Sequence, residues 1–190
     1  MLARMQSIKH SYGELMVPED VLALQNLVRK LGAPRIIEVG SWLGASAVAM
    51  RAAGGAEVHC IDTWMGTDDP TDATYRVSTE FGLGKILTHF CENVGEDLGV
   101  GIFMHIGCSA YWASRCRWKA DMVFLDADHR YRATLADIKR WTPHLRRGGI
   151  LAGHDYLTAF NDHHPGVNRA VNETGPFHTA GASIWWREIA

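Results

Sequence analysis

Short segments rich in apolar and β-branched residues alternate along this chain with longer segments of helical periodicity, and this alternation most constrains the fold. The clearest short segment is 121–126, with the sequence Asp-Met-Val-Phe-Leu-Asp. Further strands are expected at 35–39, 57–61, 101–106, 150–153 and 183–189. Such an alternation is typical of α/β proteins in which crossover helices join parallel strands. We therefore expect a mostly parallel, doubly wound sheet.

Helical segments fill the intervals between these strands. A first helix is expected over Pro18–Leu31, because Pro18 suits a first helical turn and Gly32 can end the helix. Further helices are expected to end near Gly54, near Asn93, at Gly148-Gly149 with Leu135, Ile138 and Leu145 on one side, and over Val167–Glu173. No domain boundary is evident, so residues 1–190 are expected to form a single domain with 1–16 as an N-terminal extension.

The composition excludes several classes of protein. A formal net charge of -2 argues against a nucleic-acid-binding protein, which needs a basic face. No apolar run approaches the roughly 20 residues of a membrane-spanning helix, and the first 20 residues lack the apolar core of a signal peptide. The four cysteines form no CxxC pair and no zinc-type spacing, which is typical of reduced thiols. The sequence therefore favours a cytoplasmic protein.

A glycine-containing turn follows the first strand and is the first candidate for a cofactor site. It contains Gly40, Ser41 and Gly44 and is preceded by Glu38. Glycine permits positive φ and lets the main chain approach a ligand closely. A carboxylate before the first glycine gains nothing from a pyrophosphate, whereas a sulfonium donor that carries an ammonium group could use it. The alternative is that the turn serves only strand–helix packing.

The ends of the second and third strands supply further candidate cofactor ligands. Asp62 can accept hydrogen bonds from ribose hydroxyls, as in enzymes that use either NAD or adenosylmethionine. Thr63 follows it, and Trp64 could either cover an adenosine or belong to the core. Cys108 and Ser109 could edge an adenine ring. The polar stretch 65–78 is a candidate lid over the substrate.

Several motifs together resemble a known family. They are EVGSWLG, IDTWMG, FLDADHRY, GGILAGHDY, HPGVNRAVNE and SIWW. The chain from about residue 17 onward is similar to class I S-adenosylmethionine-dependent methyltransferases of the methyltransferase domain 24 type. It is more distantly similar to catechol O-methyltransferase and to metal-dependent sugar O-methyltransferases of macrolide biosynthesis. The resemblance implies a Rossmann-like fold with an antiparallel C-terminal strand. Trp42 stands where many methyltransferases have a glycine, but catechol-type enzymes also carry an aromatic residue there.

Acidic residues end the fourth and fifth strands and predict a metal site. Asp126 and Asp155 would lie close together if these strands are neighbours, since adjacent strands are about 4.8 Å apart. Oxygen ligands such as these two carboxylates suit Mg²⁺. If His154, beside Asp155, is also a ligand, Mn²⁺ would accept its nitrogen better than Mg²⁺ would. The resemblance implies that these acids hold a metal that binds substrate hydroxyls. The alternative is that Asp126 caps a helix and Asp155 anchors a turn.

His129 follows Asp126 at the position where the similar sugar O-methyltransferases have a general base. An imidazole can accept a hydroxyl proton at neutral pH. The alternative is a surface histidine at a helix start. Tyr131 is expected to pack against the helix, and His163 and His164 are expected in an exposed loop. Of Trp185 and Trp186, one is expected in the core and the other at the surface or in an interface.

These observations favour an O-methyltransferase that uses S-adenosylmethionine on a small hydroxylated acceptor, with Asp126 and His129 in the chemistry. An NAD-type oxidoreductase is a rival, but the turn lacks GxGxxG and the chain has no room for a substrate domain. Two further hypotheses are a non-catalytic cofactor-binding module and a metal-independent methyltransferase. The absence of a large insertion suggests that a second copy of the chain supplies a pocket wall, so a homodimer is expected.

Overall fold

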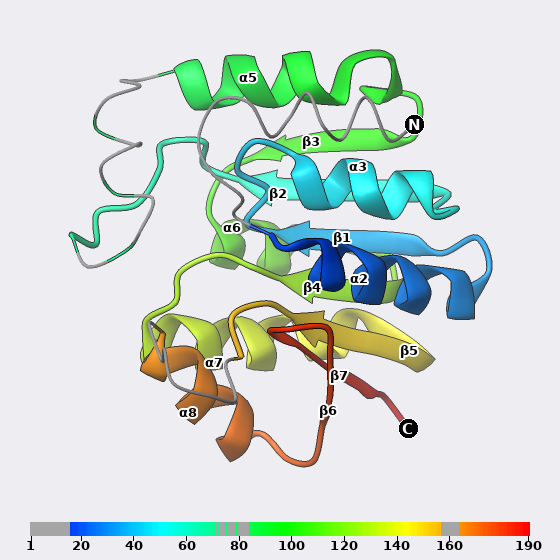
Figure 1. Cartoon of the computed structure of the whole chain (residues 1–190), viewed down its shortest axis with the longest axis vertical. Coiled ribbons are helices and arrows are strands. Elements are labelled where there is room, and N and C mark those ends of the chain that lie inside the picture. The colour runs from blue at the N-terminus through cyan, green and yellow to red at the C-terminus, as the bar shows by residue number, and fades with distance from the viewer. Residues whose placement is uncertain (1–15, 71, 73–74, 76–78, 80–83, 157–163) are drawn as a thin grey trace.

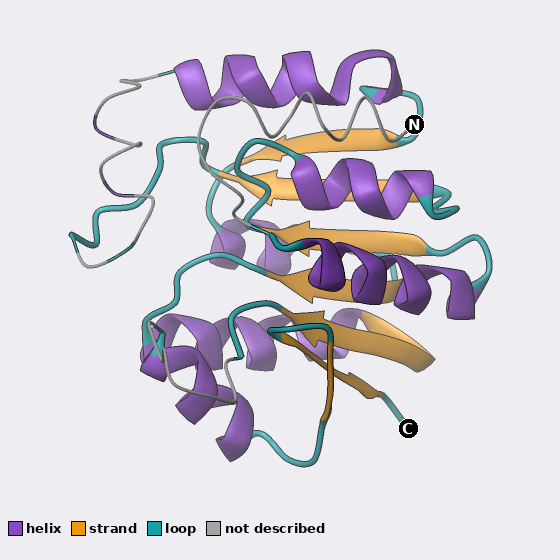
Figure 2. Ribbon diagram, in the orientation of Figure 1, coloured by secondary structure: helices purple, strands orange, loops and turns teal. Residues whose placement is uncertain are grey.

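A computed structural model describes residues 16–70, 72, 75, 79, 84–156 and 164–190. Within these residues, seven strands form one sheet with the order β3-β2-β1-β4-β5-β7-β6 (Figures 1 and 2). The strands are β1 (Arg35–Val39), β2 (Glu57–Asp62), β3 (Ile102–Ile106), β4 (Ala120–Leu125), β5 (Leu145–Gly153), β6 (His178–Ala180) and β7 (Ile184–Glu188). Strands β1 to β5 are parallel, and β7 is antiparallel to both of its neighbours, β5 and β6. The expected Rossmann-like fold is confirmed.

Helices cover both faces of the sheet. They are α2 (Pro18–Leu31), α3 (Ala45–Ala52), α5 (Lys85–Val94), α6 (Ser109–Arg115), α7 (Tyr131–Trp141) and α8 (Pro165–Glu173), with short 3-10 turns at η1 (Gly95–Asp97) and η2 (Thr142–His144). Buried residues of α2, α3 and α5 pack on one face, and those of α7 and α8 pack on the other, joined by partly buried residues of α6. The sheet is therefore the middle layer of three.

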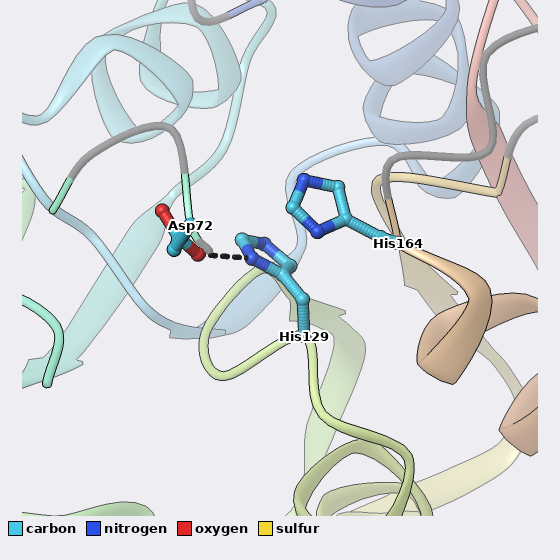
Figure 3. Close-up of side chains that lie close together, drawn as sticks. All are labelled: Asp72, His129 and His164. Carbon is cyan, nitrogen blue, oxygen red and sulfur yellow. Dashed lines mark hydrogen bonds and ion pairs between the residues drawn. The ribbon is translucent and has the colours of Figure 1, made fainter. Parts of the chain in front are cut away.

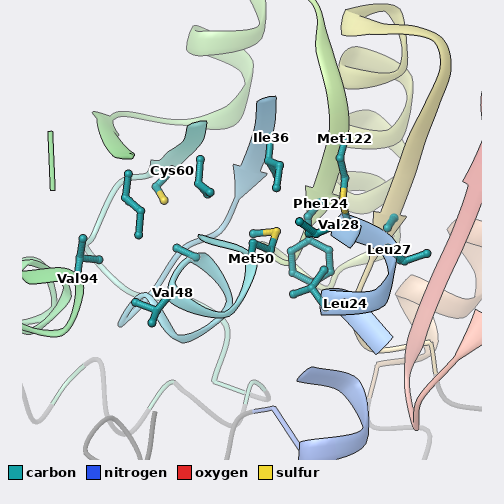
Figure 4. Packing of buried hydrophobic residues seen from close by; sticks show 14 of the residues in the cluster. Leu24, Leu27, Val28, Ile36, Val48, Met50, Cys60, Val94, Met122 and Phe124 are labelled. Carbon is teal, nitrogen blue, oxygen red and sulfur yellow. The ribbon is translucent and has the colours of Figure 1, made fainter. Parts of the chain in front are cut away.

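The strand sequences explain why both faces are covered. Successive side chains of a strand point to opposite faces, and in β1 the neighbours Ile36 and Ile37 belong to different core clusters. Figure 4 shows the first cluster, in which Ile36 lies with Met122 and Phe124 of β4 against the side chains of α2 and α3. Parallel strands buried on both faces are apolar on both faces rather than alternating, as the run Met122–Leu125 of β4 is, and in β1 the buried residues Ile36 to Val39 are interrupted only by Glu38.

The strand order reverses between β1 and β4, and this reversal positions the site. The chain runs from β1 outward to β2 and β3, and then returns to the other side of β1 through β4. In open α/β sheets, ligands bind at the carboxyl ends of the strands beside such a switch point. Val39 pairs with Leu125, and Leu125 pairs with Gly153. The residues that follow β1, β4 and β5 are therefore neighbours.

Three elements differ from the sequence predictions. The helix predicted to reach Gly148 ends at Trp141, because Pro143 in the next turn cannot continue an α-helix, and Leu145 opens β5 instead. Helix α6 and the short strand β6 were not predicted; β6 has three residues, two of them exposed, and gives no apolar signal.

Smaller predictions are confirmed. Trp185 is buried and Trp186 is only partly buried. Tyr131 packs against the core cluster that contains the buried residues of α7 and α8, and its hydroxyl donates a hydrogen bond to Glu173. Among the described residues, every helix is too short or too polar to cross a bilayer.

Candidate active site

Glycines let the turn after β1 pass close to its neighbours. Gly40 has a φ of 87°, and a Cβ at this position would overlap the carbonyl oxygen of Asp126 and lie 2.7 Å from Cα of Ala127. Gly44 has a φ of 88°, and a Cβ there would lie 3.1 Å from the ring of Phe90. Both predicted glycines are therefore required by backbone conformation and by close packing. Main-chain packing between the ends of β1 and β4 brings the turn beside Asp126.

Glu38 lies at the base of this turn and is completely buried. The hydroxyl of Ser46 donates a hydrogen bond to Oε1, whereas Oε2 has no hydrogen-bond partner among the described residues. Burial raises the pKa of Glu38 to about 7. An unsatisfied buried carboxylate oxygen is costly, and a cationic ligand above the turn would stabilise its charged form. This arrangement fits a donor with an ammonium group.

Asp62 ties the turn to the end of β2. Its Oδ2 accepts hydrogen bonds from the main-chain N–H groups of Ser41 and Trp42 at 2.8 and 2.9 Å, and its Oδ1 accepts one from Trp64 at 2.7 Å. A carboxylate has about four acceptor positions, so Asp62 retains capacity for a further donor such as a ribose hydroxyl. The sequence predicted that Asp62 binds the ribose, but it did not predict that Asp62 also accepts hydrogen bonds from the main chain of the turn.

Three residues near the site have positive φ although they are not glycines. They are Trp42 at 44°, Trp64 at 51° and Asp155 at 64°, after β1, β2 and β5 respectively. Bulky residues rarely adopt this conformation, and such strain clusters at functional sites. The side chain of Trp64 lies in the core, where its Nε1 donates to the carbonyl of Trp42 at 3.0 Å. Of its two expected roles, the structure therefore shows the packing role.

Of the residues after β3 that were predicted to contact adenine, one is hydrogen-bonded to α7 and the other is exposed. The hydroxyl of Ser109 donates to Asp137 Oδ1 at 2.6 Å and accepts a hydrogen bond from Trp141 Nε1 at 2.8 Å. These contacts direct the hydroxyl toward α7, so its predicted contact with adenine stays a prediction. Cys108 is exposed at the start of α6, and Thr63 is exposed after β2.

Asp126, His154 and Asp155 converge at the ends of β4 and β5, as predicted. One ligand atom from each residue lies within 4.8 Å of the others. His154 Nδ1 is 3.3 Å from Asp155 Oδ2 and 3.8 Å from Asp126 Oδ1. Burial raises the pKa of Asp155, but His129 and His154 outweigh that effect and hold it below its ordinary value. Two carboxylates and one imidazole nitrogen are thus available to a divalent cation.

Asp20 of α2 fixes the other nitrogen of His154, a role that no pattern in the sequence indicated. Its Oδ2 lies 3.3 Å from His154 Nε2, and its Oδ1 accepts hydrogen bonds from the main-chain N–H groups of Ala182 and Ser183 at 2.6 and 2.9 Å. Asp20 is 2 % exposed. Because Asp20 fixes Nε2, the Nδ1 atom of His154 faces the two site carboxylates.

His129 lies between two sets of carboxylates. Its Nε2 is 2.9 Å from Asp155 Oδ2 and 3.8 Å from Asp126 Oδ1, while its Nδ1 forms a 2.7 Å hydrogen bond with Asp72. Burial lowers the pKa of His129, but these three carboxylates outweigh burial and raise it to about 12. Without a neutralising cation, these carboxylates therefore favour the protonated form of His129. Its contacts argue against the alternative of a freely solvated surface histidine.

His164, expected in an exposed loop, is instead part of this site. It is partly buried at the start of α8, and its ring centroid lies 4.0 Å from that of His129 (Figure 3). The expectation was wrong because His164, at the N-terminal end of α8, lies against His129 after the end of β4. His163 lies outside the described residues, as does much of the predicted lid 65–78, of which 71, 73–74 and 76–78 are not described.

A cavity of about 240 Å³ adjoins His129 and provides space for a small acceptor. Its lining is mainly polar and consists of Asp69, Asp72, His129, Arg130, Tyr131, His164 and Gly166. The cavity lies beside the metal-capable group, because His129 belongs to the lining and also contacts Asp155. A molecule bound in this cavity would lie next to the imidazole of His129, which can transfer a proton.

Comparisons with known proteins agree with this arrangement. Three solved structures superpose on nearly the whole chain at low sequence identity. An O-methyltransferase from Bacillus cereus in complex with SAH has a TM-score of 0.69 and 14% identity, covering 97% of this chain and 90% of its own. The O-methyltransferase TomG from Streptomyces achromogenes, involved in tomaymycin synthesis and in complex with SAM, has a TM-score of 0.63 and 15% identity, covering 100% and 89%. A putative rRNA-methylase from Clostridium thermocellum has a TM-score of 0.62 and 10% identity, covering 92% and 99%.

At such identities these structures establish the fold alone, and a fold does not by itself determine the acceptor. A comparison with curated protein sequences finds no match. The family described as methyltransferase domain matches residues 37–156, which is more than half of the chain and includes the turn after β1, Asp62, Asp126 and Asp155. The chain therefore belongs to the methyltransferase-domain family and is an S-adenosylmethionine-dependent methyltransferase of class I.

Proposed function

We propose that this enzyme is a metal-assisted O-methyltransferase that acts on a small hydroxylated acceptor. The observation that carries the proposal is the convergence of Asp126, His154 and Asp155 around His129, beside both a cavity and the glycine turn. Family membership decides against an NAD-type oxidoreductase.

The donor is assigned to the turn after β1. Glu38 would stabilise its ammonium group through the oxygen that lacks a partner among the described residues, Gly40 and Gly44 would allow the main chain to approach it, and Asp62 would accept from its ribose. Asp62 also holds the N–H groups of the turn in place before the donor arrives. The donor supplies its methyl group to an acceptor oxygen by in-line displacement and leaves as adenosylhomocysteine.

Asp126, Asp155 and Nδ1 of His154 would hold the metal. Their oxygen-rich character suits Mg²⁺, and the imidazole nitrogen makes Mn²⁺ a good alternative. A bound divalent cation would lower the pKa of an acceptor hydroxyl at this site. Asp20 keeps Nδ1 of His154 directed toward the two carboxylates.

His129 would take the proton that the hydroxyl loses, on Nε2, which faces Asp126 and Asp155. This role requires a neutral imidazole, whereas its carboxylate neighbours raise the pKa of His129 to about 12. Positive charge held by Asp126 and Asp155 would offset that effect. The proposal therefore links the base to the metal, and the metal-independent alternative would leave His129 protonated.

The test is release of adenosylhomocysteine from adenosylmethionine with a panel of catechols, sugars and other polyols as acceptors. We expect turnover with at least one acceptor in Mg²⁺ or Mn²⁺, and a loss of about 100-fold or more in EDTA or in Asp126→Asn. The control is Asp97→Asn, which removes an acidic side chain of η1 that pairs with Arg51. Turnover that is unchanged by EDTA and by Asp126→Asn would overturn the metal assignment.

A further inference from the structure

Asp72, His129 and His164 form a second metal-capable group, separate from Asp126, His154 and Asp155 in all its members. One ligand atom from each lies within 4.8 Å of the others. The three come from different parts of the chain: the loop after β2, the β4–α7 connection and the start of α8. Figure 3 shows the imidazole of His129 between the carboxylate of Asp72 and the ring of His164. We propose that these three side chains form a binding site for a zinc-class transition-metal ion.

The ligand types favour such an ion over magnesium. Two imidazoles and one carboxylate suit Zn²⁺ and its neighbours, whereas Mg²⁺ prefers oxygen ligands. Zinc bonds of about 2.0–2.1 Å in a tetrahedron place ligand atoms about 3.3 Å apart. The distance between Asp72 Oδ2 and His129 Nδ1 is 2.7 Å, and the separations within the group extend to at most 4.8 Å. The one spacing given is thus shorter than the required one, and none exceeds it by more than about 1.5 Å, so side-chain movements of this size would reach it.

The surroundings of His129 supply a second, independent argument. Histidines that bind metal commonly direct their other ring nitrogen to a carboxylate, which fixes the ring and its tautomer. His129 is placed in a similar way, because Nδ1 forms a hydrogen bond with Asp72 while Nε2 lies at ion-pair distance, 2.9 Å, from Asp155 Oδ2. The cavity that adjoins the group is also lined by all three residues. It leaves room for a water or ligand atom as the fourth partner of a tetrahedral ion.

Occupancy has a chemical consequence for the neighbouring site. An ion on Nδ1 of a neutral imidazole leaves the ring proton on Nε2. That nitrogen then cannot accept a proton from an acceptor hydroxyl. This consequence, unlike the binding itself, rests on the proposed function, in which His129 is the base. The site would thus make methyl transfer sensitive to zinc even when the magnesium site is filled.

Direct binding tests the proposal without any assay of activity. Zinc affinity is measured by competition with a chromophoric chelator on Asp126→Asn, which lacks one carboxylate of the other group and so isolates this one. His164→Gln and Asp72→Asn are then added singly to that background. We expect each to weaken zinc binding by at least about tenfold. Adding His89→Gln, which removes a partly exposed histidine of α5, should leave the affinity unchanged.

Equal zinc affinity in the Asp126→Asn background with and without His164→Gln or Asp72→Asn would overturn the proposal. Binding of adenosylhomocysteine verifies that each variant is folded. If one of the two variants does not fold, the zinc affinity of the other tests the proposal. A ¹H–¹⁵N correlation spectrum of the histidine rings in the Asp126→Asn protein gives an independent result. Zinc should shift Nδ1 of His129 and a ring nitrogen of His164; unshifted resonances at saturating zinc would contradict the site. A metal-independent methyltransferase would leave these measurements unaffected, so the two proposals fail separately.

Discussion

The α-carbon of Gly40 packs so closely on the main chain of Asp126 that a methyl group at residue 40 would overlap the carbonyl oxygen of residue 126. This contact joins the turn after β1, assigned to the donor, with the first residue of the metal-capable group. Main-chain packing therefore holds the proposed donor site next to the proposed metal site. This close approach requires a glycine at residue 40.

Gly40→Ala should consequently destabilise the protein and abolish donor binding. The control is Gly32→Ala, because Gly32 has a similar φ of 82° with nothing within 4 Å of the added Cβ. Positive φ alone costs roughly 1 to 2 kcal/mol, and overpacking adds about 1 to 3 kcal/mol. Urea denaturation should thus show a larger loss of unfolding free energy for Gly40→Ala than for Gly32→Ala. Equal losses would show that the close contact is unimportant.

Asp20→Asn should destabilise the protein by about 3 kcal/mol, because it leaves His154 in a buried site with one partner carboxylate removed. The matched control is Glu19→Gln, which changes the exposed neighbouring acid of the same helix turn. Thermal or urea unfolding measures the difference, and metal affinity should fall as well, since Nε2 of His154 is no longer fixed. A variant as stable as Glu19→Gln would contradict the role assigned to Asp20.

Glu38 should impose a pH dependence on stability in the absence of donor. Burial raises its pKa from 4.5 to about 7, so between these values the folded state holds a proton that the unfolded state has released. Stability therefore falls as pH rises through this window and stays lower above pH 7, by on the order of 3 kcal/mol. Glu38→Gln should lack this contribution. The check is urea denaturation of both proteins from pH 4.5 to 8, and parallel pH profiles would refute it.

His129→Ala should lower kcat by about 10²- to 10⁴-fold with little change in KM, as expected for loss of a general base. The assay uses saturating Mg²⁺ with an acceptor identified from the panel. His89→Ala, at a partly exposed position of α5, is the histidine control. If the two variants were equally active, the base would have to be another group.

Most of the site residues that could be predicted from the sequence lie at the ends of strands. Asp62, Asp126 and Asp155 each stand at or just after the end of an apolar segment, and parallel strands bring such residues to one edge of a sheet. The proximity of Asp126 and Asp155 then followed from the one assumption that β4 and β5 are neighbours. Asp20, Asp72 and His164 have no such marker. Asp20 is one of two acids in a first helical turn, a common surface pattern, and its burial results from the packing of α2 on the start of β7.

Some backbone features also could not be predicted from the residue types at those positions. Trp42 and Trp64 have positive φ, which their residue types disfavour, so only the folded structure shows it. Leu145 fits the helical periodicity of α7 but belongs to β5, because Pro143 ends the helix and strand pairing with Ala120 takes over. Tertiary contacts therefore overrode the local signal at the two tryptophans, whereas at Leu145 a local signal, the proline, outweighed the helical periodicity.

The most direct test of the central claim is an anomalous difference map from crystals grown with adenosylhomocysteine and Mn²⁺. The account predicts a manganese peak within coordination distance of Asp126 and Asp155, with the sulfur of adenosylhomocysteine beside the turn at Gly40. The cavity next to His129 should open toward both. A manganese peak away from these two carboxylates, or adenosylhomocysteine bound elsewhere on the protein, would contradict it.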